Sequence, residues 1–235
     1  MKTFLIKFAA CIAIISVALL VSCSGTPEAR PEPKLGVTTG SRLKLELVPG
    51  PYYAKTVNLL VYSYTVWPQV AVWLERSDGS FVDTLYVTEV IVTGKYAAAP
   101  KVGRPEALPV WTALKTKAQS PVDSVSSATT VGSNVVYGSD LVSRLPPGIY
   151  VVKLETNRSY DWNKTYTKKN SGVNGQPSVI YAATIEIGGP AATVAFKPIG
   201  TGSVDGSDGL MRSGLAGIDT AFELFSSLTA TYIPE

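Results

Sequence analysis

Residues 68–87, PQVAVWLERSDGSFVDTLYV, decide the fold of this chain. The run from Pro68 to Glu75 is almost continuously apolar, which is typical of a strand that is buried on both faces. Asp78 and Gly79 supply the turn, and Phe81–Val87 returns as the partner strand. This stretch therefore predicts a β-hairpin whose first strand lies at the centre of a sheet.

Further strands surround this hairpin along the chain. Leu43, Leu45 and Leu47 alternate with polar residues, which predicts a strand with one solvated face. The other predicted strands are 57–64, 149–155, 178–187, 192–196 and 225–233. The predicted loops are 120–139, 157–176 and 200–217, the second being a long hairpin excursion. Strands at this spacing predict an all-β domain over residues 41–235, an immunoglobulin-like β-sandwich.

One segment breaks the strand pattern, because helix formers gather there. Leu108, Trp111 and Leu114 recur at three-residue spacing, as on one face of a helix. Pro109 interrupts the segment, which limits the expected helix to one or two turns. We therefore predict one short helical insertion in the sandwich, around Pro105 to Leu114.

The N-terminus has the residue order of a secretory signal, which runs from basic to apolar to small. Lys2 and Lys7 are the basic residues at the N-terminus, and an uninterrupted apolar run follows them from Phe8 to Val21. That run is too short for a comfortable transmembrane span. We therefore predict a lipoprotein signal peptide at residues 1–22.

The residues at the end of this signal indicate which type of signal peptide it is. Residues 20–23, LVSC, resemble the bacterial lipobox, in which the cysteine is acylated and becomes the first residue after cleavage. Cys23 is therefore the predicted lipidation site, and 23–40 a flexible tether to the lipid bilayer. We expect a location in the cell envelope, either on the periplasmic side or at the outer membrane, which Ser24 would permit.

Composition narrows the chemistry of the exported part. The sequence contains no histidine, which excludes His-ligated zinc, copper or haem and any triad with an imidazole base. Cys11 leaves with the signal and Cys23 is expected to be lipidated, so no thiol remains for a disulfide or a thiolate metal site. A conventional hydrolase is disfavoured, although carboxylate pairs could serve one. We therefore predict no catalytic residue and no metal site.

The formal charge shows no large excess of positive charge, which a nucleic-acid-binding protein would carry. It is +3 for the whole chain and falls to about +1 once Lys2 and Lys7 leave with the signal. We expect no nucleic-acid partner.

Several runs, in order, resemble the bacterial periplasmic family called domain of unknown function 2271. The resemblance covers roughly residues 45 to 190. The matching runs are Pro68–Glu75 with Asp78–Gly79, Thr84–Val87, Arg104–Pro105 with Leu108–Pro109 and Trp111, Val122–Thr129, Leu145–Tyr150 and Gln176–Tyr181. The resemblance implies an exported β-sandwich without an assigned activity. It also implies an association with extracytosolic flavin chemistry.

Residues 123–129, DSVSSAT, are similar to the motif at which a flavin transferase attaches FMN to exported redox proteins. The resemblance makes Thr129 the acceptor, with Asp123, Ser126 and Ala128 as motif residues. Ser127 stands where that motif has glycine, which puts the tight backbone turn in doubt. The alternative is a hydroxyl-rich loop that needs no chemistry.

The aromatic residues near this motif allow two interpretations. They could stack on a flavin ring, or they could fill the core and the surface of the hairpin excursion, which is the interpretation we favour. These residues are Trp111, Tyr137, Tyr160 and Trp162. The stretch from Tyr160 to Tyr166 also offers a contact surface for a carbohydrate or a protein, or cross-strand pairs that stiffen the excursion.

The sequence thus predicts a membrane-anchored extracytoplasmic lipoprotein, a non-hydrolytic component of an envelope redox or binding system. Its expected partners are the bilayer and an envelope redox protein or flavin transferase. The alternative is an electron-transfer protein that carries covalent FMN on Thr129.

Asp205–Gly209 spaces its carboxylates as short calcium loops do, but such Asp-Gly repeats are more often turns.

Overall fold

The structure is a computed structural model that describes residues 40–58, 60–96, 104, 106–118, 126–127, 134–137 and 139–235. Of residues 126–127, 134–137 and 139–140 it describes the backbone alone. All of the described residues belong to one compact unit, Val37–Glu235. None of their helices is long and apolar enough to cross a membrane.

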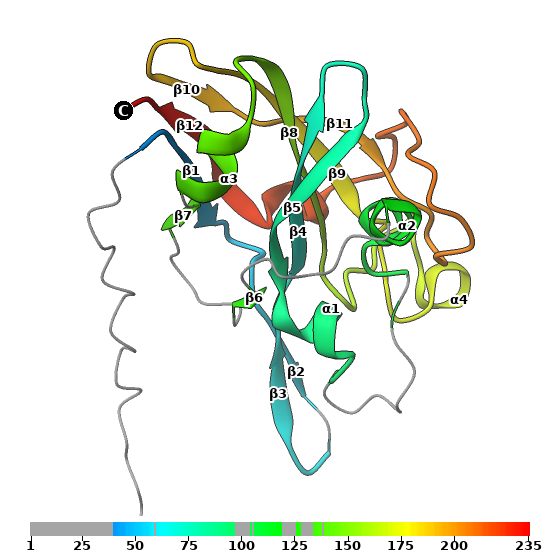
Figure 1. Ribbon diagram of the computed structural model, residues 1–235. Coiled ribbons are helices and arrows are strands. Elements are labelled where there is room, and N and C mark those ends of the chain that lie inside the picture. Colours follow the sequence, from blue (N-terminus) through cyan, green and yellow to red (C-terminus); the bar gives the residue numbers. More distant parts are fainter. Residues whose placement is uncertain are drawn as a thin grey trace, which may run out of the picture. The chain divides into compact units, whose positions relative to one another are not determined.

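The larger sheet has six strands in the order β11-β9-β8-β4-β5-β6. Their bounds are Lys197–Thr201 (β11), Val179–Ile187 (β9), Gly148–Asn157 (β8), Gln69–Arg76 (β4), Phe81–Thr88 (β5) and Ser126–Ser127 (β6). Neighbours are antiparallel except β5 and β6. The predicted hairpin is confirmed, because β4 pairs with β5 on one side and with β8 on the other (Figure 1).

The smaller sheet has four strands in the order β10-β12-β1-β7. Their bounds are Ala192–Ala195 (β10), Phe225–Ile233 (β12), Arg42–Pro49 (β1) and Asn134–Tyr137 (β7). The alternation predicted for β1 is present, since Leu43 and Leu45 are fully buried. The first and last of the described strands therefore meet in this sheet, where β1 pairs antiparallel with β12.

The two sheets share one hydrophobic core, which confirms the all-β sandwich. From the small sheet it takes Leu43, Leu45, Leu228, Ala230 and Tyr232; from the large one Val70, Val72, Leu74, Val152, Leu154, Ala183 and Ile185. From β4, Val70, Val72 and Leu74 enter this core, whereas Ala71 and Trp73 enter a second one on the outer face. The near-continuous apolar run of β4 follows from this burial on both faces. Its immunoglobulin-like character stays a prediction.

The second core is covered by helix α2, Pro109–Ala118. Leu108, Val110 and Trp111 pack there against Ala71, Trp73, Val87 and Ile180. The predicted helical insertion is confirmed, but the helix begins at Pro109 and is not interrupted by it. Proline fits this first position because the first helical N–H needs no intrahelical acceptor.

Two sequence predictions need correction, one of a strand and one of a loop. The run 57–64 is not one strand: β2, Lys55–Asn58, and β3, Ser63–Val66, form a hairpin in which each pairs with the other alone (Figure 1). The segment 120–139, predicted as loop, contains β6 and β7 and the start of α3, Ser139–Arg144. Val135, Val136 and Tyr137 favour a strand, and β7 pairs antiparallel with β1.

Three further short helical elements connect the strands. They are α1, Glu89–Thr93, α4, Lys168–Ser171, and a 3-10 turn at Thr220–Glu223. Helix α4 lies in the connection between β8 and β9, which are antiparallel neighbours. The predicted long excursion at 157–176 is therefore present, and it holds the site described next.

Candidate functional site

Four aromatic rings, Tyr62, Tyr64, Tyr160 and Trp162, form a continuous row that we call the aromatic surface. Tyr62 and Tyr64 come from β3, with ring centroids 6.2 Å apart. Tyr64 meets Tyr160 edge to face at 6.5 Å, and Tyr160 meets Trp162 in the same way at 5.4 Å. Aromatic pairs of this kind contribute about 0.5–1.5 kcal/mol each beyond their buried area, so these contacts favour the observed arrangement.

A hydroxyl contact joins the two segments that build this row. The Tyr64 hydroxyl donates to the Tyr160 hydroxyl over 2.9 Å. This hydrogen bond is the main reason why the pKa of Tyr64 is raised to about 12. Tyr62 is 52 % exposed, while the rings of Tyr64, Tyr160 and Trp162 are each partly exposed. The aromatic surface is therefore joined by a hydrogen bond between its two segments and is still accessible.

Two lysines complete the aromatic surface. The Lys55 ammonium lies 5.7 Å from the centre of a Trp162 ring, and the Lys168 ammonium lies 6.0 Å from it. Lys55 also donates to the backbone carbonyl of Tyr160. Its pKa is lowered, first by burial and then by the charge of Arg158. Such cation–π contacts place positive charge beside the rings.

A buried polar network lies directly beneath the aromatic surface. Arg158 forms an ion pair with Asp161 in which both side chains are at least 95 % buried. Arg158 also donates to the backbone carbonyl of Tyr52. Asp161 accepts from Gln176 Nε2 at 3.0 Å and from the Thr220 hydroxyl at 2.8 Å. The network therefore fixes the residue that lies between Tyr160 and Trp162.

The backbone at this point adopts unusual conformations that the network stabilises. Tyr160 has φ +61°, the left-handed region that few residues other than glycine adopt. Gly175 has φ +76°, and a Cβ there would lie 2.6 Å from backbone atoms of Asp161. Only glycine allows the two segments this close approach.

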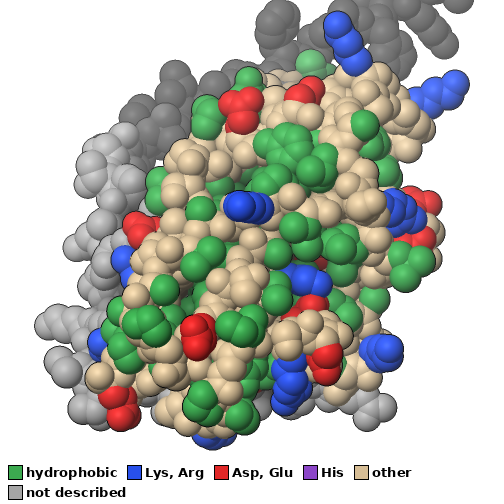
Figure 2. Space-filling view, turned by 90° about the horizontal axis from the view of Figure 1, so that it is seen from above, with side chains coloured by type: hydrophobic (Ala, Val, Ile, Leu, Met, Phe, Trp, Pro, Cys, Tyr) green, Lys and Arg blue, Asp and Glu red, His purple; other side chains and the backbone are tan. Residues whose placement is uncertain are grey.

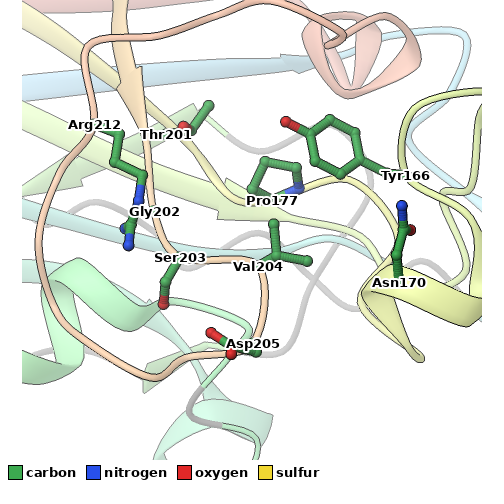
Figure 3. Close-up of a pocket in the computed structure, with 9 residues that line it drawn as sticks. All are labelled: Tyr166, Asn170, Pro177, Thr201, Gly202, Ser203, Val204, Asp205 and Arg212. Carbon is green, nitrogen blue, oxygen red and sulfur yellow. The ribbon is translucent and has the colours of Figure 1, made fainter.

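A small pocket lies beside the same excursion (Figure 3). Its volume is about 290 Å³. The lining residues are Tyr166, Asn170, Pro177, Thr201, Gly202, Ser203, Val204, Asp205 and Arg212. In Figure 3, Tyr166 and Asn170 face the loop from Thr201 to Asp205. The size is near the lower limit for small-molecule sites, and the lining is mixed in polarity.

A buried carboxyl group lies behind this pocket. Glu155 is fully buried and accepts hydrogen bonds from Trp111 N at 2.8 Å and Ser178 Oγ at 2.6 Å. Gly202 covers it, since a Cβ there would lie 2.4 Å from Ser178 Oγ. Burial raises the pKa of Glu155 to about 7, although its hydrogen bonds favour the charged form. The group therefore caps α2 from the sheet and titrates near neutral pH.

This carboxyl group predicts a pH dependence of stability. Its folded pKa of about 7 lies above the ordinary 4.5, so its stabilising effect is full below pH 4.5 and is lost as pH rises through 7. We expect its contribution to the free energy of unfolding to fall by about 3 kcal/mol over that window. Urea unfolding from pH 4.5 to 8 should show this slope in the native chain but not in Glu155→Gln, whereas Ser178→Ala should shift it to higher pH. An unchanged slope in Glu155→Gln would show that another group titrates.

Of the site residues predicted from the sequence, the structure describes only Ser126. Cys23, Asp123, Ala128 and Thr129 lie outside the described residues, so their roles stay predictions. Ser126 lies in β6, at the edge of the large sheet.

The aromatic residues singled out from the sequence separate into core and surface. Trp111 is in the second core, 2 % exposed, as the favoured interpretation predicts. Tyr160 and Trp162 belong to the aromatic surface, and Tyr137 is described by its backbone alone. Sequence reasoning missed Lys55 and the meeting of β3 with the excursion. Alternate aromatics at 62 and 64 and at 160 and 162 were the available signal.

The Asp205–Gly209 segment forms turns, as expected. The Asp205 and Asp208 carboxylates each accept from a backbone N–H two residues on, at 3.0 Å. Asp208 also pairs with Arg212 at 2.7 Å. In the part of the chain that the structure describes, no three acidic or sulfur side chains come together as a metal site would need.

The comparisons with known proteins give one match. The model of a family described as "Predicted periplasmic protein (DUF2271)" matches residues 53–176, more than half of the chain. The matched region includes β2, β3 and the excursion, and therefore the whole aromatic surface. No curated protein and no solved structure matches the chain. The chain belongs to the periplasmic family of domain of unknown function 2271, as its sequence resemblance implied.

Proposed function

We propose that this protein is a lipid-anchored binding component of the cell envelope that holds a partner protein on the aromatic surface. The observation that carries this function is the fixed, accessible row of Tyr62, Tyr64, Tyr160 and Trp162. The periplasmic family and the signal pattern that ends at Cys23 support the location.

The chemistry of the aromatic surface suits a protein partner. Tyrosine and tryptophan are enriched among the residues that dominate binding energy at protein interfaces. Here the Arg158–Asp161 network holds the segment that carries Tyr160 and Trp162 before any partner arrives, which lowers the entropy cost of binding. Lys55 and Lys168 add positive charge at the rim, which favours a partner with carboxylates or backbone carbonyls there.

Photo-crosslinking in the cell tests this function. Lys168 is exposed beside Trp162, so a photo-reactive residue there should give a discrete adduct, whereas one at exposed Ser77 in the β4–β5 turn should give none. Trp162→Ala should weaken the complex by about 2 kcal/mol, roughly thirty-fold, and abolish the adduct. Trp162→Phe keeps a ring and should retain most of it. An adduct that survives Trp162→Ala, or none from position 168, would refute the proposal.

The second candidate function is electron transfer by FMN attached to Thr129. Its basis is the motif at residues 123–129, of which the structure describes the backbone of Ser126–Ser127 as β6, at the edge of the large sheet. The flavin ring would supply the redox chemistry, and the protein its attachment. Intact mass after co-expression with a flavin transferase tests this candidate: a mass increase by one FMN that Thr129→Ala abolishes is expected, and an unmodified mass excludes it.

A further inference from the structure

The tip of the β2–β3 hairpin carries the most exposed large apolar side chains among the described residues. Leu60 is fully exposed, Val61 is 89 % exposed and Tyr62 is 52 % exposed. The hairpin extends away from the two sheets (Figure 1), and among the described strands β2 and β3 pair only with each other. These side chains add nothing to either core, so their exposure calls for an external partner.

Side-chain chemistry changes in a fixed order along this hairpin. Leu60 and Val61 form the apolar tip, Tyr62 and Tyr64 follow, and Lys55 lies at the base, opposite Val66. The sequence from Lys55 to Val66 contains no carboxylate. A bilayer has the matching order of hydrocarbon, interface and anionic headgroups. Aromatic rings are favoured at the interface, and lysines are favoured beside the anionic headgroups.

The tether gives this hairpin access to the bilayer. Sixteen residues separate Cys23 from Gly40, where the described chain begins, and they can span at most about 55 Å. That reach exceeds the radius of gyration of a domain of this size, about 16 Å. A chain held at Cys23 also meets the membrane at a high effective concentration, so a weak insertion suffices.

We propose that the β2–β3 hairpin inserts Leu60 and Val61 into the bilayer to which the chain is tethered, with Tyr62 and Tyr64 at the interface. The opposite end of the domain differs. Figure 2, the view from above, shows apolar side chains there interspersed with both Lys/Arg and Asp/Glu. The insertion would give the aromatic surface a defined position at the membrane boundary. This inference rests on the anchoring in the proposed function.

The test supplies the anchor chemically, so that it does not depend on acylation of Cys23. The chain from Ser24 onward, with an N-terminal histidine tag in place of Cys23, is bound to vesicles of phosphatidylcholine, phosphatidylglycerol and a nickel-chelating lipid. Because this chain has no other thiol, Val61→Cys accepts one environment-sensitive fluorophore. The matched control is Ala191→Cys, which is exposed in the β9–β10 turn at the far end (Figure 1).

The expected result is a blue shift of the fluorophore at 61 on vesicles, with quenching by lipids that carry a nitroxide in the acyl chain. The fluorophore at 191 should emit as in buffer, and Leu60→Asp should abolish the shift at 61. Emission at 61 that stays as in buffer would overturn the proposal. So would burial of position 61 in a dimer without vesicles, which would assign the tip to a second copy of this chain. Failure of acylation in the cell would leave this vesicle result unchanged, so the two proposals fail separately.

Discussion

Replacing Asp161 by alanine is expected to lower the free energy of unfolding by about 3–5 kcal/mol. The carboxylate accepts from Arg158, Gln176 and Thr220, all in buried or partly buried positions. Its loss leaves the Arg158 guanidinium buried without a charge partner, which costs more than the ion pair itself contributes. Urea unfolding measures this loss of stability. The Asp161→Ala substitution should also abolish the crosslink from position 168, because residues 160 and 162 flank the substituted position.

The control for this variant removes both charges. Arg158→Met with Asp161→Ala should be less destabilised than the sum of the two single variants, because no unpaired charge remains. A loss below about 1 kcal/mol in Asp161→Ala, as at exposed ion pairs, would show that the network does not hold the aromatic surface.

Replacing Trp111 by alanine is expected to cost about 3–5 kcal/mol, because it opens a cavity in the second core. Trp111 is 2 % exposed and packs in the cluster that holds α2 against β4 and β5. Its indole N–H also donates to Thr84 Oγ1 at 3.0 Å.

Two variants control for the size and place of this ring. Trp111→Phe should cost less than Trp111→Ala, because most of the volume remains and only the hydrogen bond is lost. Trp162→Ala removes an equal ring from a partly exposed position and should cost less still. If Trp111→Ala unfolds at the same urea concentration as Trp162→Ala, α2 is not part of the fold's stable core.

The sequence predicted the central hairpin and the sandwich because β4 is buried on both faces, and such burial demands an apolar run. It missed β7, because the strand-favouring run of Val135, Val136 and Tyr137 is short, lies in a hydroxyl-rich segment and pairs with β1, about ninety residues away. The bounds of α2 depended on reading Pro109 as a first helical residue and not as an interruption.

The aromatic surface was predictable only in part. The sequence drew attention to Tyr160 and Trp162, but the row exists because residues 64 and 160, separated by 96 positions, meet in space. The same holds for Glu155, whose raised pKa comes from burial beneath α2 and Gly202 and not from any local motif.

Anchoring through Cys23 is the claim on which both the location and the membrane contact depend. The most direct measurement is the N-terminal mass of the native protein isolated from its own membranes. We expect the chain to begin at Cys23 and to carry a diacylglyceryl group on that sulfur, with incorporation of labelled palmitate. A mature chain that begins at another residue, or that takes up no palmitate, would contradict the account.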